Sequence, residues 1–264
     1  MPEPGSQLVR DRAALLDRRA ALGLLGLGGS ALAACGSSGA MAQAAACIAS
    51  PRETRGPFAA DGGSDAAGRL NVLESEGIVR SDIRDSFAGM TGTADGVALD
   101  LEIRVLGTLG ECNPMAGWAV YLWQNDADGA YSLYNLPDRN YLRGLQQTGD
   151  DGTLRFMTIV PGCYGGRAPH VHFEVYSSAQ AAISGEPAVL ASQLSFPEEA
   201  CRRIYASDPR YGGSLANLER WNNRSDFVFR DGDAQTRSQQ MIEMVDPRGG
   251  DSPRRGFATV GIRY

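Results

Sequence analysis

Residues 97–106, VALDLEIRVL, predict the fold more clearly than any other stretch of the chain. Apolar and polar side chains alternate along the whole stretch, as in a strand with one face on a core and the other toward water. Further strands are expected at 118–123, 154–160, 170–176 and 191–196. Turns rich in Gly, Asp and Pro separate these segments. The sequence therefore predicts an all-β protein, an antiparallel β-sandwich with long loops and a few short helices.

The segments outside these strands are less regular. Short helices are expected at 198–206 and 217–222, and the tail segments 227–229 and 257–262 are expected to return to the sheets as strands. Residues 78–83 fit either a short strand or a turn. No internal repeat is present.

Length and composition limit the class of protein. The chain has 264 residues, of which 43% are hydrophobic and 21% charged, the mix of a soluble globular domain with additional segments. A net charge of −6 argues against a nucleic-acid partner, since nucleic acid favours basic surfaces. The sequence contains no lysine, which excludes Schiff-base and lysine-nucleophile chemistry.

The first residues have the pattern of an export signal. Arg18 and Arg19 precede a short apolar run that ends in Leu-Ala-Ala-Cys35, so residues 1–35 are predicted to be a twin-arginine-like signal. The same four residues form a possible lipobox, in which Cys35 would carry a lipid that tethers the protein to a membrane. Ordinary signal cleavage nearby is the alternative. Residues 36–46 are read as a flexible tether and 47–264 as the folded domain, exported to the periplasm or cell surface.

Export implies an oxidising compartment, where cysteines pair. Four cysteines follow Cys35, which allows three connectivities. Cys47 precedes the first strand and Cys112 lies in a turn, so a Cys47–Cys112 pair is favoured. The pair Cys163–Cys201 then follows by subtraction.

The residues that indicate chemistry lie at 160–175, VPGCYGGRAPHVHFEV. The only two histidines of the chain, His170 and His172, form an H-x-H in a strand-like run. Alternate side chains of a strand share a face, so the two imidazoles can bind one cation. Tyr164 adds a phenol and Arg167 a guanidinium just upstream. Imidazole suits first-row transition metals, and anionic oxygen donors shift the preference toward harder ions.

Other chemistries fit these residues less well than a metal–phenolate site. A lone H-x-H is a weak indicator, because exposed strand histidines occur by chance. A catalytic zinc site normally takes three His, Glu or Asp ligands, and the chain has no third histidine. Serine hydrolysis would have to use the same clustered histidines as its base. Tyr131, Tyr134 and Tyr141, taken singly, are expected to be packing residues.

Taken in order, five motifs change this expectation. They are GAYSLY (129–134), YLRGLQQT (141–148), TIVPGCY (158–164), GRAPHVH (166–172) and SQL (192–194). This order resembles the intradiol ring-cleavage dioxygenases, the non-haem ferric family that includes catechol and protocatechuate dioxygenases. The similarity covers roughly residues 47–196, and ETRGPF (53–58) and VRSDI (79–83) resemble the same family.

The resemblance implies a site, a cofactor and a reaction. The cofactor would be Fe(3+). The implied metal ligands are Tyr131, Tyr164, His170 and His172, and the implied catalytic residues are Tyr164, Arg167 and Gln193. Tyr131 would stay on the metal and Tyr164 would leave it when substrate binds; motif position favours Tyr131 over Tyr134 as the first ligand. The partners would be a catechol-type diol and O2, and the product a muconate-type diacid.

Some points stay open at the level of sequence. The runner-up function is an exported catechol- or aromatic-binding β-sandwich lipoprotein without turnover. The helical dimerisation segment of intracellular catechol enzymes is absent, which resembles the exported single-domain branch of the family. The sequence predicts neither the particular catechol nor the oligomeric state. Arg52, Arg55, Arg139 and Arg143 are all candidates for a cation at the pocket mouth.

Overall fold

The computed structural model of the protein describes residues 48–63, 68–246 and 252–264. All of these belong to one compact unit, Met41–Tyr264. The predicted export signal (1–35), the tether (36–46) and Cys47 lie outside the described residues. Within the described ranges, no helix has the length and apolar character needed to cross a membrane.

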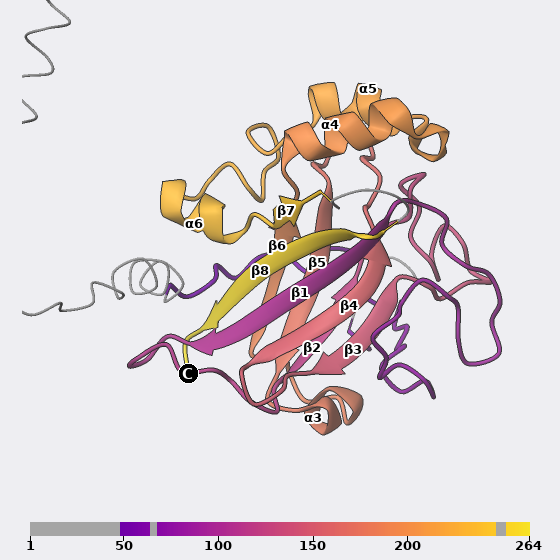
Figure 1. Cartoon of the computed structure of the whole chain (residues 1–264). Helices are drawn as coiled ribbons and strands as arrows, with labels where there is room; N and C mark the ends of the chain where they lie inside the picture. Colours follow the sequence, from indigo (N-terminus) through magenta and orange to yellow (C-terminus); the bar gives the residue numbers. More distant parts are fainter. Residues whose placement is uncertain (1–47, 64–67, 247–251) are drawn as a thin grey trace, which may run out of the picture. The chain divides into compact units, whose positions relative to one another are not determined.

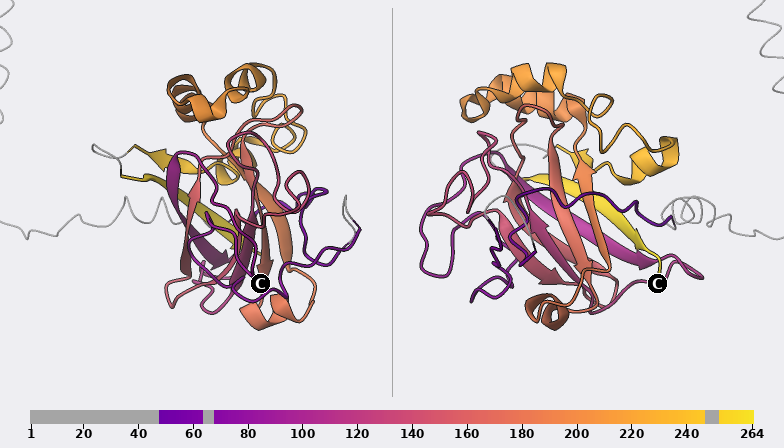
Figure 2. Two further views of the ribbon diagram at one scale, coloured as in Figure 1. Left: turned by 90° about the vertical axis from the view of Figure 1, so that its right-hand side faces the viewer. Right: turned by 180° about the vertical axis from the view of Figure 1, so that it is seen from behind.

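Two four-stranded sheets form the centre of this unit (Figures 1 and 2). The first has the order β4-β1-β8-β7 and consists of β1 (Ala98–Gly107), β4 (Thr153–Ile159), β7 (Glu243–Val245) and β8 (Arg254–Ile262). The second has the order β3-β2-β5-β6 and consists of β2 (Ala119–Trp123), β3 (Arg143–Gln147), β5 (His170–Tyr176) and β6 (Leu190–Ser195). The predicted all-β sandwich is confirmed.

One strand pair departs from the predicted antiparallel arrangement. β1 and β8 run parallel, from Leu99 opposite Arg254 to Gly107 opposite Ile262. The other pairs within the two sheets are antiparallel. A parallel neighbour requires a long crossover, and here the chain visits the second sheet and the helices before β8 returns beside β1.

The alternation in the first strand packs one face of β1 on the core. Four alternate side chains have no exposed surface: Leu99, Leu101, Ile103 and Val105. Burial of each such side chain stabilises the fold by roughly 1.5–3 kcal/mol. Asp100 and Glu102 point to the other face, where Arg155 of β4 lies 3.2 and 3.3 Å from their carboxylates.

The outer face of the second sheet is covered by the N-terminal arm, residues 48–63 (Figure 2, right). Backbone Glu53 donates to Ala191 O of β6 at 2.9 Å, and Tyr121 Oη of β2 donates to Ala59 O at 2.8 Å. As a result, all seven residues of β5 are buried, including those on its outer face. Polar side chains buried in this way cost free energy unless they are paired or bind a ligand.

The helices are short: α3 (Ala179–Ile183), α4 (Glu198–Ser207), the 3-10 helix η1 (Pro209–Tyr211), α5 (Ser214–Arg220) and α6 (Ala234–Gln239). The helix expected at 198–206 is α4, and the one expected at 217–222 begins earlier, as α5. The strand expected at 227–229 is wrong. Those residues form turns because Asp226 accepts hydrogen bonds from the backbone of both Ala168 and Val228, which holds the chain in a bend.

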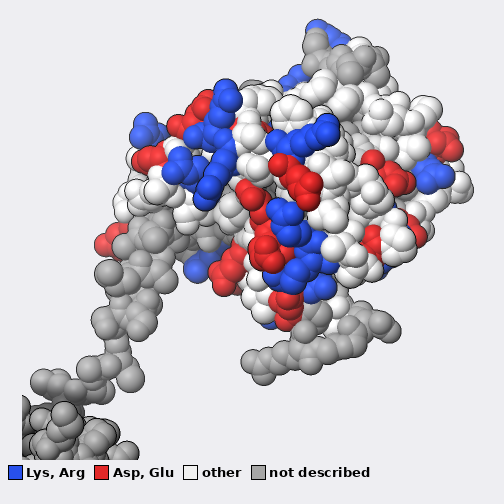
Figure 3. Space-filling model, turned by 90° about the horizontal axis from the view of Figure 1, so that it is seen from above, with Lys and Arg blue, Asp and Glu red and all other residues white. Residues whose placement is uncertain are grey.

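Figure 3 views the molecule from the side of α4 and α5, and basic and acidic side chains lie interspersed there. Arg203 of α4 lies 3.8 Å from Glu199 and 3.3 Å from Asp246. Exposed pairs of this kind contribute at most about 1 kcal/mol each, so they add little to the stability of this face.

The favoured pairing of Cys163 with Cys201 is wrong. Both thiols are free and buried. Cys163 Sγ faces the carbonyl oxygen of Arg167 at 3.4 Å, and Cys201 lies on the buried side of α4, in the apolar core. Cys112 is disulfide-bonded, but Cys47 lies outside the described residues, so the pairing of these two stays a prediction.

We expect the two free thiols to be unreactive in the folded protein. Burial raises the pKa of Cys163 and of Cys201 to about 12, and the thiolate is the reactive form. Iodoacetamide at pH 8 should leave the peptides carrying both residues unmodified before unfolding and fully alkylated after unfolding without reductant. Alkylation of Cys201 only after reduction would contradict the structure.

Candidate active site

Four donor side chains converge on the outer face of β5. His170 and His172 point to the same face, and their Nε2 atoms lie 3.0 Å apart. His170 Nε2 also lies 3.4 Å from both Tyr131 Oη and Tyr164 Oη, and the two phenol oxygens are 3.5 Å apart. The structure thus brings together all four residues predicted to be metal ligands.

The spacing of these four atoms fits a bound first-row metal ion. Ligands held about 2.0–2.2 Å from one ion, at angles between square and tetrahedral, are separated by about 3.0–3.5 Å. Two imidazole nitrogens and two phenol oxygens also form a donor set suited to a hard trivalent ion. Within the described residues, no group of three or more His, Cys, Asp and Glu side chains is placed to bind a metal. A metal at this site would therefore need the phenols.

Tyr131 and Tyr134 have different surroundings although both come from the loop after β2. Tyr131 is 1% exposed, and its ring packs 4.7 Å from Phe58 of the arm. Tyr134 Oη instead accepts a hydrogen bond from backbone Ala60 at 3.0 Å. The backbone of Tyr131 is anchored to Asn135 Oδ1 at 2.9 Å, which fixes the position of its phenol.

Tyr164 comes from the loop between β4 and β5 and is less enclosed than Tyr131. Its ring is half-buried and lies 5.9 Å from that of Tyr131, edge-on. Gly165 and Gly166 follow it, and Gly166 has a φ of +98°, a conformation that glycine adopts without strain. Of the two phenols, that of Tyr164 therefore has the greater freedom to move.

The two imidazoles are oriented by different contacts. His170 Nδ1 donates to Ala168 O at 2.6 Å, which leaves the lone pair on Nε2 free for a metal. The ring of His172 stacks on Trp123 of the neighbouring strand, with centroids 5.0 Å apart and planes 7° from parallel. His172 Nδ1 has no hydrogen-bond partner within the described part of the chain.

Burial sets the protonation of these groups. It lowers the pKa of His170 to about 3 and that of His172 well below the usual value, with the charge of Arg167 acting in the same direction. Both imidazoles are therefore neutral at pH 7, the form that binds metals. Burial also raises the pKa values of Tyr131 and Tyr164, so the phenolate forms need a cation beside them.

Arg167 lies beside the histidines and belongs to a hydrogen-bonded chain. Its Nη1 is 3.3 Å from His170 Nε2, and its Nη2 donates to Gln193 Oε1 at 2.5 Å. Gln193 Nε2 in turn donates to Thr54 O of the arm at 2.6 Å. Two of the three predicted catalytic residues, Arg167 and Gln193, are thus in contact with each other, and Gln193 also contacts the N-terminal arm.

Three residues of the site were not found from the sequence. Trp123 supports His172, and its place directly opposite His172 in the β2–β5 register follows only once those strands are paired. Gly56 has a φ of +70°, and a Cβ there would lie 3.1 Å from His172 Cε1, so a bare backbone is needed. Asp226 binds Arg167 from a segment where the sequence analysis expected a strand (227–229) and no site residue.

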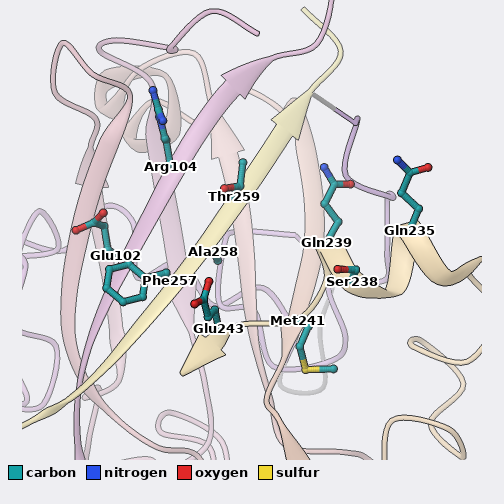
Figure 4. Close-up of a pocket in the computed structure, with 10 residues that line it drawn as sticks. All are labelled: Glu102, Arg104, Gln235, Ser238, Gln239, Met241, Glu243, Phe257, Ala258 and Thr259. Atoms are coloured by element: carbon teal, nitrogen blue, oxygen red, sulfur yellow. The ribbon is translucent and has the colours of Figure 1, made fainter. Parts of the chain in front are cut away.

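A separate cleft of about 670 Å³ lies on the other sheet (Figure 4). Its walls come from β1, β8 and α6 and include Glu102, Phe257 and Gln239. None of the ten residues drawn in Figure 4 is a predicted site residue. The cleft is therefore distinct from the site on β5.

Comparison with known proteins agrees with the fold and with the motifs. Residues 80–201 match the family model described as Dioxygenase. An intradiol ring-cleavage dioxygenase from Tetranychus urticae is 24% identical over 82% of this chain and 94% of its own, with a TM-score of 0.61. The dioxygenase domain of a dioxygenase carbohydrate-binding protein fusion from Streptomyces sp. SirexAA-E is 24% identical over 81% and 98%, with a TM-score of 0.50. No curated protein matches the sequence.

These matches bear on the class of the protein. Residues 80–201 are similar to the Dioxygenase family model, and the two solved structures share the fold of this chain. The resemblance to the intradiol ring-cleavage dioxygenases, predicted from the ordered motifs, is confirmed. The chain spans nearly the whole length of both structures.

Proposed function

We propose that the protein is a ferric intradiol dioxygenase that inserts both atoms of O2 into a catechol-type diol and opens the ring to a muconate-type diacid. The observation that carries this proposal is the convergence of Tyr131, Tyr164, His170 and His172, whose donor atoms are linked by four contacts of 3.0–3.5 Å. Arg167 and Gln193 lie at the edge of the same cluster.

The donor set matches the cofactor that this reaction needs. Two phenolates and two neutral imidazoles stabilise the +3 state of iron, which is a hard acid. Ferric iron held by these residues would supply a Lewis acid that binds a catechol and makes its ring reactive toward O2. Residues Tyr131 and His170 are almost fully buried, so they are suited to be the permanent part of this site.

Tyr164 and Arg167 are suited to act on the substrate. With iron bound, the phenolate oxygen of Tyr164 could accept a phenolic proton from an arriving catechol. Its half-buried position in the loop before β5 gives it room to do so. Arg167 supplies a fixed cation where negative charge would grow on the substrate ring.

Isotope incorporation tests the reaction directly. The iron-loaded protein is supplied with catechol under ¹⁸O2, and the product mass is measured. We expect one labelled oxygen in each carboxylate of a muconate-type diacid. Catechol that is bound but returned unchanged would instead support the runner-up function, an aromatic-binding lipoprotein without turnover.

Removing one phenol oxygen at a time tests which tyrosine of the loop after β2, Tyr131 or Tyr134, binds iron. Tyr131→Phe should lower iron affinity by at least about 10–100-fold and reduce the visible absorption of the iron form, since a phenolate ligand is lost. Tyr134→Phe, the matched control, removes the acceptor for backbone Ala60 and should keep the iron spectrum. A normal iron spectrum in the Tyr131→Phe variant would exclude Tyr131 as a ligand.

We also propose that the protein is exported and that Cys35 tethers it to a membrane. The support is the Leu-Ala-Ala-Cys35 sequence together with the disulfide bond at Cys112, which requires an oxidising compartment. In a bacterial host, the full chain should fractionate with membranes and Cys35→Ser should release it or retain its precursor. Equal fractionation of the two proteins would contradict the lipid tether.

A further inference from the structure

We propose that Asp226 is a positioning residue that holds Arg167 in its orientation over the substrate. This inference rests on the proposed function, because it assigns Asp226 a role in ring cleavage through Arg167. Asp226 lies outside the residues matched by the family model, in the segment between α5 and α6. Its side chain has no exposed surface.

The contacts of Asp226 use both of its carboxylate oxygens. Oδ2 accepts from Arg167 Nε at 2.9 Å and from backbone Ala168 at 2.7 Å, and Oδ1 accepts from backbone Val228 at 2.8 Å. Three donors to a fully buried carboxylate leave it little rotational freedom. The carboxylate therefore fixes both the Arg167 side chain and the start of the backbone that leads to His170.

The guanidinium of Arg167 needs such a partner. Its side chain is only 11% exposed, and a buried cation without a paired anion costs several kcal/mol. Gln193 Oε1 and His170, which the guanidinium also contacts, are neutral. Asp226 is the carboxylate that the structure pairs with Arg167, and bonding through Nε leaves both terminal nitrogens directed toward the site.

The segment that carries Asp226 also limits the movement of Arg167 from the side. The guanidinium carbon lies 5.0 Å from the centroid of the Phe227 ring and 6.0 Å from that of Phe229. Contacts of this kind with aromatic faces favour a planar cation in one orientation. Phe227 is 53% exposed, so it forms the outer wall beside Arg167.

These contacts link the segment around Asp226 to the N-terminal arm, and both lie outside residues 80–201, which match the family model. The contacts run from Asp226 through Arg167 and Gln193 to Thr54 of the arm. Arg167 is thus held at one end by an anion and at the other by an amide. This arrangement keeps the cation fixed before substrate arrives, which is the condition for electrostatic stabilisation without reorganisation.

A double-mutant cycle on the full-length iron-loaded protein tests the proposal, with catechol as substrate. The variants are Asp226→Asn, Arg167→Ala and the double variant, and the matched control is Asp208→Asn. Asp208 also pairs with an arginine and accepts from a backbone N–H, but it does so at η1. Iron content, the visible spectrum and the anaerobic affinity for catechol are measured beside kcat and KM.

We expect Asp226→Asn to lower kcat about 10–100-fold with KM changed less than about threefold, because positioning partners usually act at this size. Its iron spectrum and anaerobic catechol affinity should match those of the unsubstituted protein. In the Arg167→Ala background the same substitution should have no further effect on kcat, since coupled residues are not additive. Asp208→Asn should keep kcat.

Two results would overturn the proposal: additive losses in the double variant, or the same kcat for Asp226→Asn and Asp208→Asn. If Asp226→Asn does not fold, Arg167→Lys tests the same link, since lysine keeps the charge but cannot bind Asp226 and Gln193 together. Unchanged kcat in that variant would also overturn it. Failure of the unsubstituted protein to cleave catechol would instead count against the proposed function.

Discussion

Substitution of His172 by alanine is expected to abolish iron binding and to lower kcat for catechol cleavage by at least about 10³-fold. A metal ligand supplies several kcal/mol of activation, and each 1.36 kcal/mol corresponds to a factor of about ten in rate. His172 Nε2 lies 3.0 Å from His170 Nε2, so its loss leaves three donors where the site has four. Iron content by metal analysis and oxygen uptake measure the two effects.

A volume-matched variant separates ligand loss from damage to packing. His172 stacks on Trp123, so alanine also removes an aromatic contact. His172→Gln fills more of the space, cannot replace imidazole as a strong ligand, and should lose iron in the same way. Iron binding that survives both substitutions, with ring cleavage intact, would show that His172 is not a ligand.

Substitution of Arg143 by methionine is expected to lower the free energy of unfolding by about 3–5 kcal/mol. Arg143 has no exposed surface and donates to Ser132 Oγ, to Ser132 O and to Ala59 O, at 2.9–3.0 Å. Methionine would remove the donor to buried Ser132 O and one of the two donors to Ala59 O, which would keep only its bond from Tyr121 Oη. Ala60, Leu133 and Leu142 next to these contacts have φ of +54°, +69° and +56°, conformations that cost free energy and need support.

The matched control for Arg143→Met is Arg155→Met. Arg155 is half-exposed on the outer face of β4 and pairs with two surface carboxylates, so the change should cost less than about 1 kcal/mol. Thermal and denaturant unfolding measure both. Because Ser132 follows Tyr131, Arg143→Met should also weaken iron binding. Equal stability of the two variants would contradict the structural role of Arg143.

Several features of the fold and site could be predicted because they depend on local periodicity. The period of two in β1 predicted its buried face, and the same period put His170 and His172 on one face of β5. These strand features require only the pleat of a strand. The meeting of Tyr131 and Tyr164 with the histidines was implied instead by the resemblance of the ordered motifs to the intradiol dioxygenases.

Other features depend on which segments meet in space, and no local pattern predicts that. Arg143, one of the four candidates for a cation at the pocket mouth, is instead fully buried and holds the arm to the Tyr131 loop. Asp226 reaches Arg167 across 59 positions of sequence. The predicted disulfide between Cys163 and Cys201 rested only on the number of cysteines left after Cys47 and Cys112 were paired. The structure leaves both thiols free.

The central claim is that two phenolates and two imidazoles bind ferric iron that acts on a catechol. The visible spectrum of the iron-loaded mature domain tests it most directly, before and after catechol is added in air. We expect a phenolate-to-iron absorption band that shifts to longer wavelength with catechol and decays as muconate absorption grows. Stoichiometric iron without any such band would show that Tyr131 and Tyr164 are not ligands and would contradict the claim.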